Sequence, residues 1–153
     1  MTMEWILLFP LAPMIYQDFK YRNVTLWQLL LFGIIQMTVC FYKYGAIQTG
    51  INTLTNVAVM GIISAAVIVY AYFRFQRKQQ LIGSGDILFI LLLAPYFLCP
   101  YFLHFLIISF LLALVGWWIG VYMKGKKTFQ IPLVSYLGIC YSVVVVYNSL
   151  SCL

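Results

Sequence analysis

The sequence predicts an all-α membrane protein, a single polytopic bundle of about six transmembrane helices over residues 1–153. Three observations support this fold class: the composition, a series of long apolar segments and the placement of the basic residues. Of the 153 residues, 65% are hydrophobic and 8% are charged, whereas soluble domains are about half apolar and about a quarter charged. A soluble fold of this length cannot hide so much apolar surface, so a lipid bilayer is expected around it.

A helix needs about 20 apolar residues to cross the hydrocarbon core. The expected helices are residues 3–16, 26–42, 52–73, 86–97, 101–123 and 131–148. The first is short and contains Pro10 and Pro13, which predict a kink. No small-residue cleavage site follows it, so we expect it in the mature protein. The fourth is also short, because Pro95 and Pro100 interrupt it, and it is expected where the bilayer is locally thinned.

Basic residues predict the orientation of these helices. Lys43 lies between the second and third helices. The others follow the first, third and fifth helices: Lys20, Arg22, Arg74, Arg77, Lys78, Lys124, Lys126 and Lys127. Short loops rich in lysine and arginine stay in the cytoplasm, so both termini are expected outside. The same loops account for the net charge of +6, and no nucleic-acid partner is expected.

The acidic residues are few, and two of them are predicted at the same depth. Asp18 ends the first helix and Asp86 begins the fourth, both at the cytoplasmic boundary, whereas Glu4 lies at the outer end. Carboxylates at membrane depth are functional candidates, although a lone boundary aspartate is also often only solvated or a helix cap. We expect the two side chains to face one common cavity.

Two carboxyl groups in contact share a proton and titrate as a pair. In aspartic proteases the ionised member takes a proton from water, and the neutral member donates one to the substrate carbonyl. This chemistry needs no metal or cofactor, and none is expected, because the cysteines form no CxxC pair and His104 lies near the outer end of its helix. The helix dipole at Asp86 favours its anion, which suggests that Asp86 is the more readily ionised member.

The segment Gly83-Ser84-Gly85-Asp86 resembles the GxGD motif of the type IV prepilin peptidases and archaeal preflagellin peptidases. Two more segments match this family in the right order: DFKYRNV at 18–24, and IPLVSYLG at 131–138, similar to the Ile-Pro-Phe stretch near the family's last helix. Together with their helices, the three matches extend over essentially the whole chain.

This resemblance implies an aspartic endopeptidase of a prokaryotic plasma membrane, which removes the short basic leader of pilin-like or flagellin-like precursors. Asp18 and Asp86 correspond to its catalytic pair. The residues expected to support the site or contact substrate are Gly83, Ser84, Gly85, Lys20, Arg22, Ile131 and Pro132. Gly83 and Gly85 lack a Cβ, so a substrate backbone has room beside Asp86.

The sequence departs from the family pattern at three positions, Thr25, Leu88 and Leu133, where proline, lysine and phenylalanine are usual. Because of these departures, one alternative is that the protein is a catalytically silent or divergent member of the family that acts as a membrane scaffold. An ion or proton transporter that uses the paired acids is another. The chain lacks the cysteine-bearing N-terminal extension of many bacterial members, so we expect no N-methyltransferase activity. The sequence carries no signal of the oligomeric state.

Three polar or small residues are expected to serve packing. Gln36 and Asn56 lie inside predicted helices and are expected to form hydrogen bonds between helices. Gly116, in a GxxxG pattern, predicts close contact with a neighbouring helix.

Overall fold

A computed structural model describes residues 3–21, 23–75, 83–124 and 132–151. These residues form helices joined by short turns, and no strand occurs among them. The elements are η1 (Met3–Leu7), α1 (Leu8–Tyr21), α2 (Leu26–Phe75), α3 (Ser84–Leu93), η2 (Ala94–Tyr96), α4 (Cys99–Lys124) and α5 (Leu133–Ser151). The predicted all-α class is therefore confirmed for the described residues.

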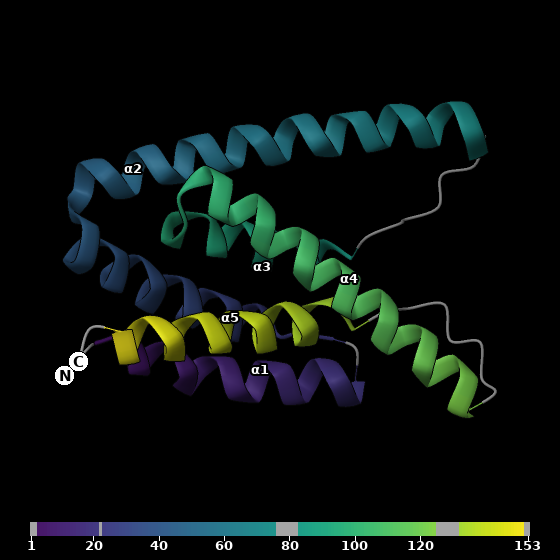
Figure 1. Ribbon diagram of the computed structural model, residues 1–153, viewed down its shortest axis with the longest axis horizontal. Helices are drawn as coiled ribbons and strands as arrows, with labels where there is room; N and C mark the ends of the chain where they lie inside the picture. Colours follow the sequence, from purple (N-terminus) through teal and green to yellow (C-terminus); the bar gives the residue numbers. More distant parts are fainter. Residues whose placement is uncertain (1–2, 22, 76–82, 125–131, 152–153) are drawn as a thin grey trace.

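The second and third predicted helices are joined in α2, which has a sharp bend at Gly45. The predicted connection at residues 43–51 is helical except at this glycine, whose φ of 78° and ψ of 164° are not helical. Only glycine adopts this region readily, so one residue reverses the chain and no longer loop is needed. The two arms of α2 diverge from the bend (Figure 1).

The helices run back and forth along the long axis of the molecule (Figure 1). α1 lies along α5, and α4 packs against the other side of α5. The short elements α3 and η2 contact α2, and η2 sits close to its bend. The ends of α1, α2 and α4 point to the same end of the molecule (Figure 1).

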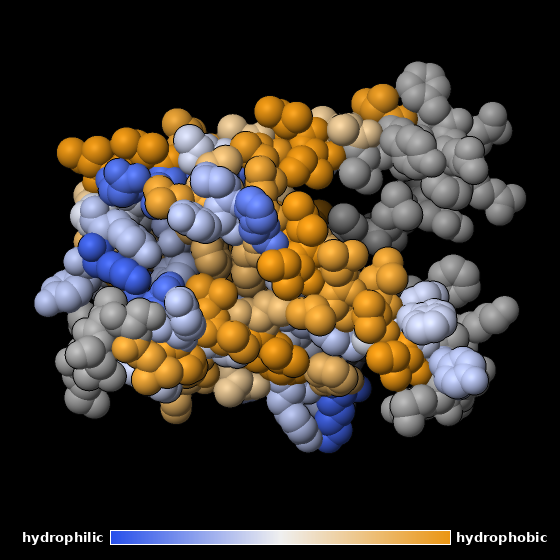
Figure 2. Space-filling view, in the orientation of Figure 1, coloured by the Kyte–Doolittle hydropathy of each residue, from blue (hydrophilic) through white to orange (hydrophobic). Residues whose placement is uncertain are grey.

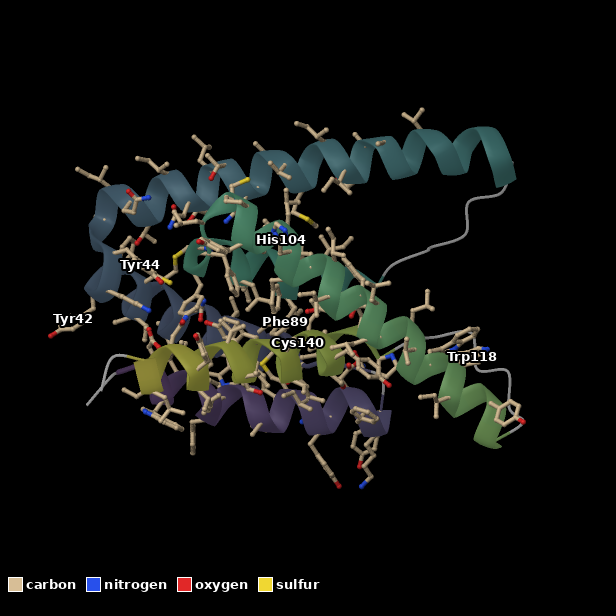
Figure 3. All side chains as sticks on the ribbon, viewed as in Figure 1. Tyr42, Tyr44, Phe89, His104, Trp118 and Cys140 are labelled. Carbon is tan, nitrogen blue, oxygen red and sulfur yellow. The ribbon has the colours of Figure 1, made fainter. Side chains whose placement is uncertain are left out.

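Three helical stretches among the described residues are long and apolar enough to cross a membrane: Leu26–Ala66, Cys99–Ile119 and Leu133–Leu150. A shorter apolar helix covers Gly85–Tyr96. Figure 2 shows apolar side chains over much of the visible face, and hydrophilic residues gathered where α2 bends. Tyr42 and Trp118 are exposed near opposite ends of the molecule (Figure 3), the positions that interfacial aromatic residues prefer.

Aromatic rings fill the centre of the bundle. Phe89 of α3 lies in the middle (Figure 3), and its ring centroid is 5.5 Å from that of Phe32 on α2. The ring of Tyr141 on α5 meets Phe32 edge-on at 6.1 Å. Close packing at Gly116 is also confirmed, because a Cβ there would collide with the ring of Tyr136.

Buried polar groups link the helices, as predicted for Gln36 and Asn56. The Tyr141 hydroxyl donates a hydrogen bond of 2.7 Å to Gln36 Oε1. Asn56 Nδ2 donates to the carbonyl oxygens of Ala94 and Phe97 at 2.8 and 2.7 Å. At the end where α2 bends, Lys43 forms an ion pair with the buried Glu4. These bonds satisfy polar atoms that would be costly inside an apolar bundle, whereas Gln36 Nε2 and Asn56 Oδ1 are buried without a hydrogen-bond partner among the described residues.

The bend of α2 gives a test with an internal control. Gly45→Ala is expected to destabilise the protein by about 1–3 kcal/mol, because alanine is strained at this φ and ψ. Gly50→Ala, in the same helix, is expected to stabilise it by up to ~1 kcal/mol through helix propensity. Neither added Cβ meets an atom within 4 Å, so the difference in unfolding free energy between the two variants reports the backbone conformation at Gly45. Denaturation in mixed micelles measures it, and equal effects of the two changes would contradict the bend.

Candidate functional site

Asp18 lies on the buried face of α1. Leu7, Leu11, Met14 and Asp18 recur at helical spacing and are all buried, and Asp18 is only 4% exposed. Residues spaced by three and four share one side of a helix, so the carboxyl continues an apolar stripe into the bundle. It is therefore held inside the protein and not at the lipid surface.

The Asp18 carboxyl is bound by the first turn of α5. Ser135 donates two hydrogen bonds to Asp18 Oδ2, one from its backbone N–H and one from Oγ, both 2.7 Å long. The Ser135 hydroxyl also lies 3.2 Å from the carbonyl oxygen of Ile15. The first N–H groups of a helix have no partner within the helix, and here one of them is satisfied by a carboxylate.

Asp86 lies in the first turn of α3, and this helix begins directly after the extended residue Gly83. Gly83 has φ of −67° and ψ of 143°, and its carbonyl oxygen accepts the first helical hydrogen bonds from Asp86 N and Ile87 N. A Cβ at Gly83 would lie 3.0 Å from Asp86 Oδ2, whereas one at Gly85 would meet nothing within 4 Å. Gly83 therefore lets the carboxyl fold back over the start of its helix, and Gly85 leaves the space beside it open.

One cavity of about 530 Å³ joins the two carboxyl groups. Its lining comprises Asp18, Asn23, Val24, Thr25, Leu26, Leu29, Gly83, Gly85, Asp86, Leu88 and Val134. It thus lies between the end of α1, the start of α2, the start of α3 and the start of α5. The prediction that both aspartates face a common cavity is confirmed.

Electrostatics couple the two aspartates. Burial raises the pKa of Asp86 from 3.8 to about 6, and the nearby charge of Asp18 adds to the increase. Hydrogen bonds from the backbone of Gly83 and Val134 act in the opposite direction. Burial and repulsion by Asp18 therefore act against the helix dipole at Asp86, and the expectation that Asp86 is the more readily ionised member stays a prediction.

The predicted supporting residues have mixed positions. Lys20 does not line the cavity: its Nζ lies 3.4 Å from the Tyr16 hydroxyl and packs over the rings of Tyr16 and Tyr21. Pro132 directly precedes α5 and is half-buried, outside the cavity lining. Arg22 and Ile131 lie outside the described residues, as does the side chain of Ser84.

Sequence reasoning missed Ser135, the residue that binds Asp18. Ser135 lies inside the IPLVSYLG segment, but a serine in the first turn of an apolar helix is common and carries no specific signal. It also missed the walls of the cavity, which come from the non-helical residues Asn23–Thr25 and from Leu29 and Leu88. Only the packing of the helices brings these residues to the aspartates.

The described part of the chain has no group of three or more His, Cys, Asp or Glu side chains arranged to hold a metal ion. No protein-family model matches the chain, and no significant match occurs among curated proteins or solved structures.

Proposed function

We propose that this protein is a membrane aspartic endopeptidase in which Asp18 and Asp86 activate water. The observation that carries the proposal is the shared cavity: two carboxyl groups from distant parts of the chain lie in it, and burial together with the charge of Asp18 raises the pKa of Asp86. Such coupling is the electrostatic condition for one proton to be held between two carboxyl groups.

The proposed reaction uses both carboxyl groups at once. The ionised aspartate takes a proton from water while the water oxygen forms a bond to the carbonyl carbon of the substrate peptide. The neutral aspartate donates its proton to the carbonyl oxygen, giving a neutral tetrahedral diol. The aspartate that took the proton from water then gives it to the amide nitrogen as the C–N bond breaks, and the other aspartate takes a proton from a hydroxyl group of the diol, so that the new carboxylic acid and amine leave and the pair again shares one proton.

The proposed substrates are pilin-like or flagellin-like precursors with a short basic leader before an apolar helix. The positive-inside pattern supports a cytoplasmic position for the cavity and six spans with both termini outside, in a prokaryotic plasma membrane. A scissile peptide must leave its helix to reach a carboxyl pair. The cavity is lined by the non-helical residues Asn23–Thr25 and has open space at Gly85, which leaves room for an extended substrate segment.

Co-expression with a panel of pilin-like and flagellin-like precursors tests this function. We expect leader removal from at least one precursor, seen as a loss of mass and a new amino terminus in mass spectrometry. Asp18→Ala and Asp86→Ala should each abolish it, because each removes one half of the proton transfer. Thr38→Ala is the control, since Thr38 is exposed and bonds only to the carbonyl of Ile34 in its own helix.

The other functions predict different results. A scaffold gives no cleavage of any precursor, and neither aspartate substitution changes its partners. A transporter gives a proton or ion flux in proteoliposomes that depends on both aspartates without cleavage. Cleavage that survives either substitution would rule out the paired mechanism.

A further inference from the structure

The first turn of α5 touches both carboxyl groups of the cavity. Ser135 donates from its N–H and its hydroxyl to Asp18, and the preceding residue, Val134, interacts through its backbone with Asp86. Consecutive residues of α5 therefore lie beside the two aspartates, which come from α1 and α3. The short hydrogen bonds from this turn are made to Asp18, and Val134 lines the cavity that contains Asp86.

The contacts on the two aspartates differ in kind. Asp18 Oδ2 accepts two short hydrogen bonds, and an ionised carboxylate is a pure acceptor that suits two donors. These donors lie at the N-terminus of a helix of 19 residues, where the dipole also favours negative charge. Among the described side chains, none donates a hydrogen bond to Asp86.

We infer that Ser135 is a positioning residue that holds Asp18 as the ionised base, and that Asp86 is the neutral acid. This inference rests on the proposed function and assigns its two roles. Asp18 then takes the proton from water, and Asp86 donates its proton to the carbonyl oxygen. The described lining of the cavity contains no lysine, arginine or histidine, so no described cation lies in it to reverse these roles. The raised pKa of Asp86 agrees with a carboxyl that keeps its proton to a higher pH than an ordinary aspartate does.

The pH profile of cleavage tests the role of Ser135. The acid limb of kcat/KM is expected to report Asp18, which must be ionised, and the alkaline limb Asp86, which must be protonated. Ser135→Ala removes one donor from Asp18, so it should move the acid limb to higher pH and lower kcat/KM at pH 5 roughly tenfold. Ser135→Thr keeps the hydroxyl, so the position of the acid limb and the value of kcat/KM at pH 5 should both match those of the wild type. A shift of the alkaline limb alone, or an unchanged profile, would overturn the assignment.

A second measurement needs no substrate. Carboxyl ¹³C signals of labelled aspartate in the purified protein come only from Asp18 and Asp86, and Asp18→Asn and Asp86→Asn identify them. We expect the signal of Asp86 to titrate at the higher pH, and its midpoint to fall in Asp18→Asn, which removes the neighbouring charge. A higher midpoint for Asp18 overturns the inference even if cleavage is found. Failure to find any cleavage, with Asp86 titrating higher, refutes the peptidase proposal and leaves the ionisation order intact.

Discussion

Asp86→Asn is expected to abolish cleavage and, at the same time, to raise the thermal stability of the protein at neutral pH. The side chain of asparagine has the same shape but cannot donate a proton as an acid, so we expect a loss of at least ~100-fold in kcat. The gain in stability has a separate origin. Above pH 6 the carboxylate of Asp86 is ionised in a partly buried site beside Asp18, and the amide removes that unfavourable charge.

The pH dependence of this gain follows from the direction of the shift. The pKa of Asp86 rises from 3.8 to about 6 on folding, so between these values the folded protein holds a proton that the unfolded chain has released. The stability contributed by this group is complete below pH 4 and is lost as the pH rises through about 6. The melting temperature of Asp86→Asn should therefore equal that of the wild type at pH 4 and exceed it at pH 7.5.

Asp18→Asn is the matched comparison, because it should also abolish cleavage but lower the stability at pH 7.5. Its carboxylate accepts two hydrogen bonds from Ser135, and bonds to a charged acceptor are each worth about 1.5–3 kcal/mol. A neutral amide weakens them. Thermal scans of both variants in detergent at the two pH values measure the difference. A loss of stability in Asp86→Asn at both pH values would contradict the electrostatic description of the cavity.

Much of the helical architecture follows from the sequence, because the pattern of apolar segments is long and strong. Residues 26–42, 101–123 and 131–148 are expected as helices; α2 and α4 contain the first two ranges, and α5 contains the third from Leu133 onward. The bend of α2 was not located, since Gly45 looks like any glycine of a connecting loop until its φ is known. The chain turns at Gly45 alone, whereas the sequence predicts a longer connection over residues 43–51.

The pairing of the acidic residues was partly predictable. Boundary depth and the GSGD segment suggested that Asp18 and Asp86 share a cavity, and depth can be read from the helix ends. The surroundings of each carboxyl group could not be read in this way. The sequence places Asp86 at a helix N-terminus but does not show its burial, and it gives no sign that Ser135 donates to Asp18. Both depend on the packing of α5.

Asn56→Leu is expected to cause the largest loss of stability among single changes far from the cavity. Its Nδ2 supplies both hydrogen atoms to buried carbonyl oxygens, those of Ala94, which begins η2, and Phe97, which directly follows it. Leucine has a similar volume but no donor, so two buried carbonyl groups lose their partner. At about 1–3 kcal/mol for each unsatisfied group, we expect a loss of roughly 2–5 kcal/mol.

This change should also reduce cleavage, because η2 continues directly from α3, whose first turn carries Asp86. Asn56 anchors the far end of this unit to the second arm of α2, and loosening it leaves Asp86 less well placed toward Asp18. Thr55→Val is the matched control: Thr55 is the adjacent residue, and its hydroxyl bonds only within α2, to the carbonyls of Ile51 and Asn52. Denaturation in mixed micelles and the precursor assay compare the two variants. Equal stability of Asn56→Leu and Thr55→Val would mean that the carbonyl groups of η2 find other donors, and normal cleavage in a destabilised Asn56→Leu would mean that Asp86 is positioned by α5 and Gly83 alone.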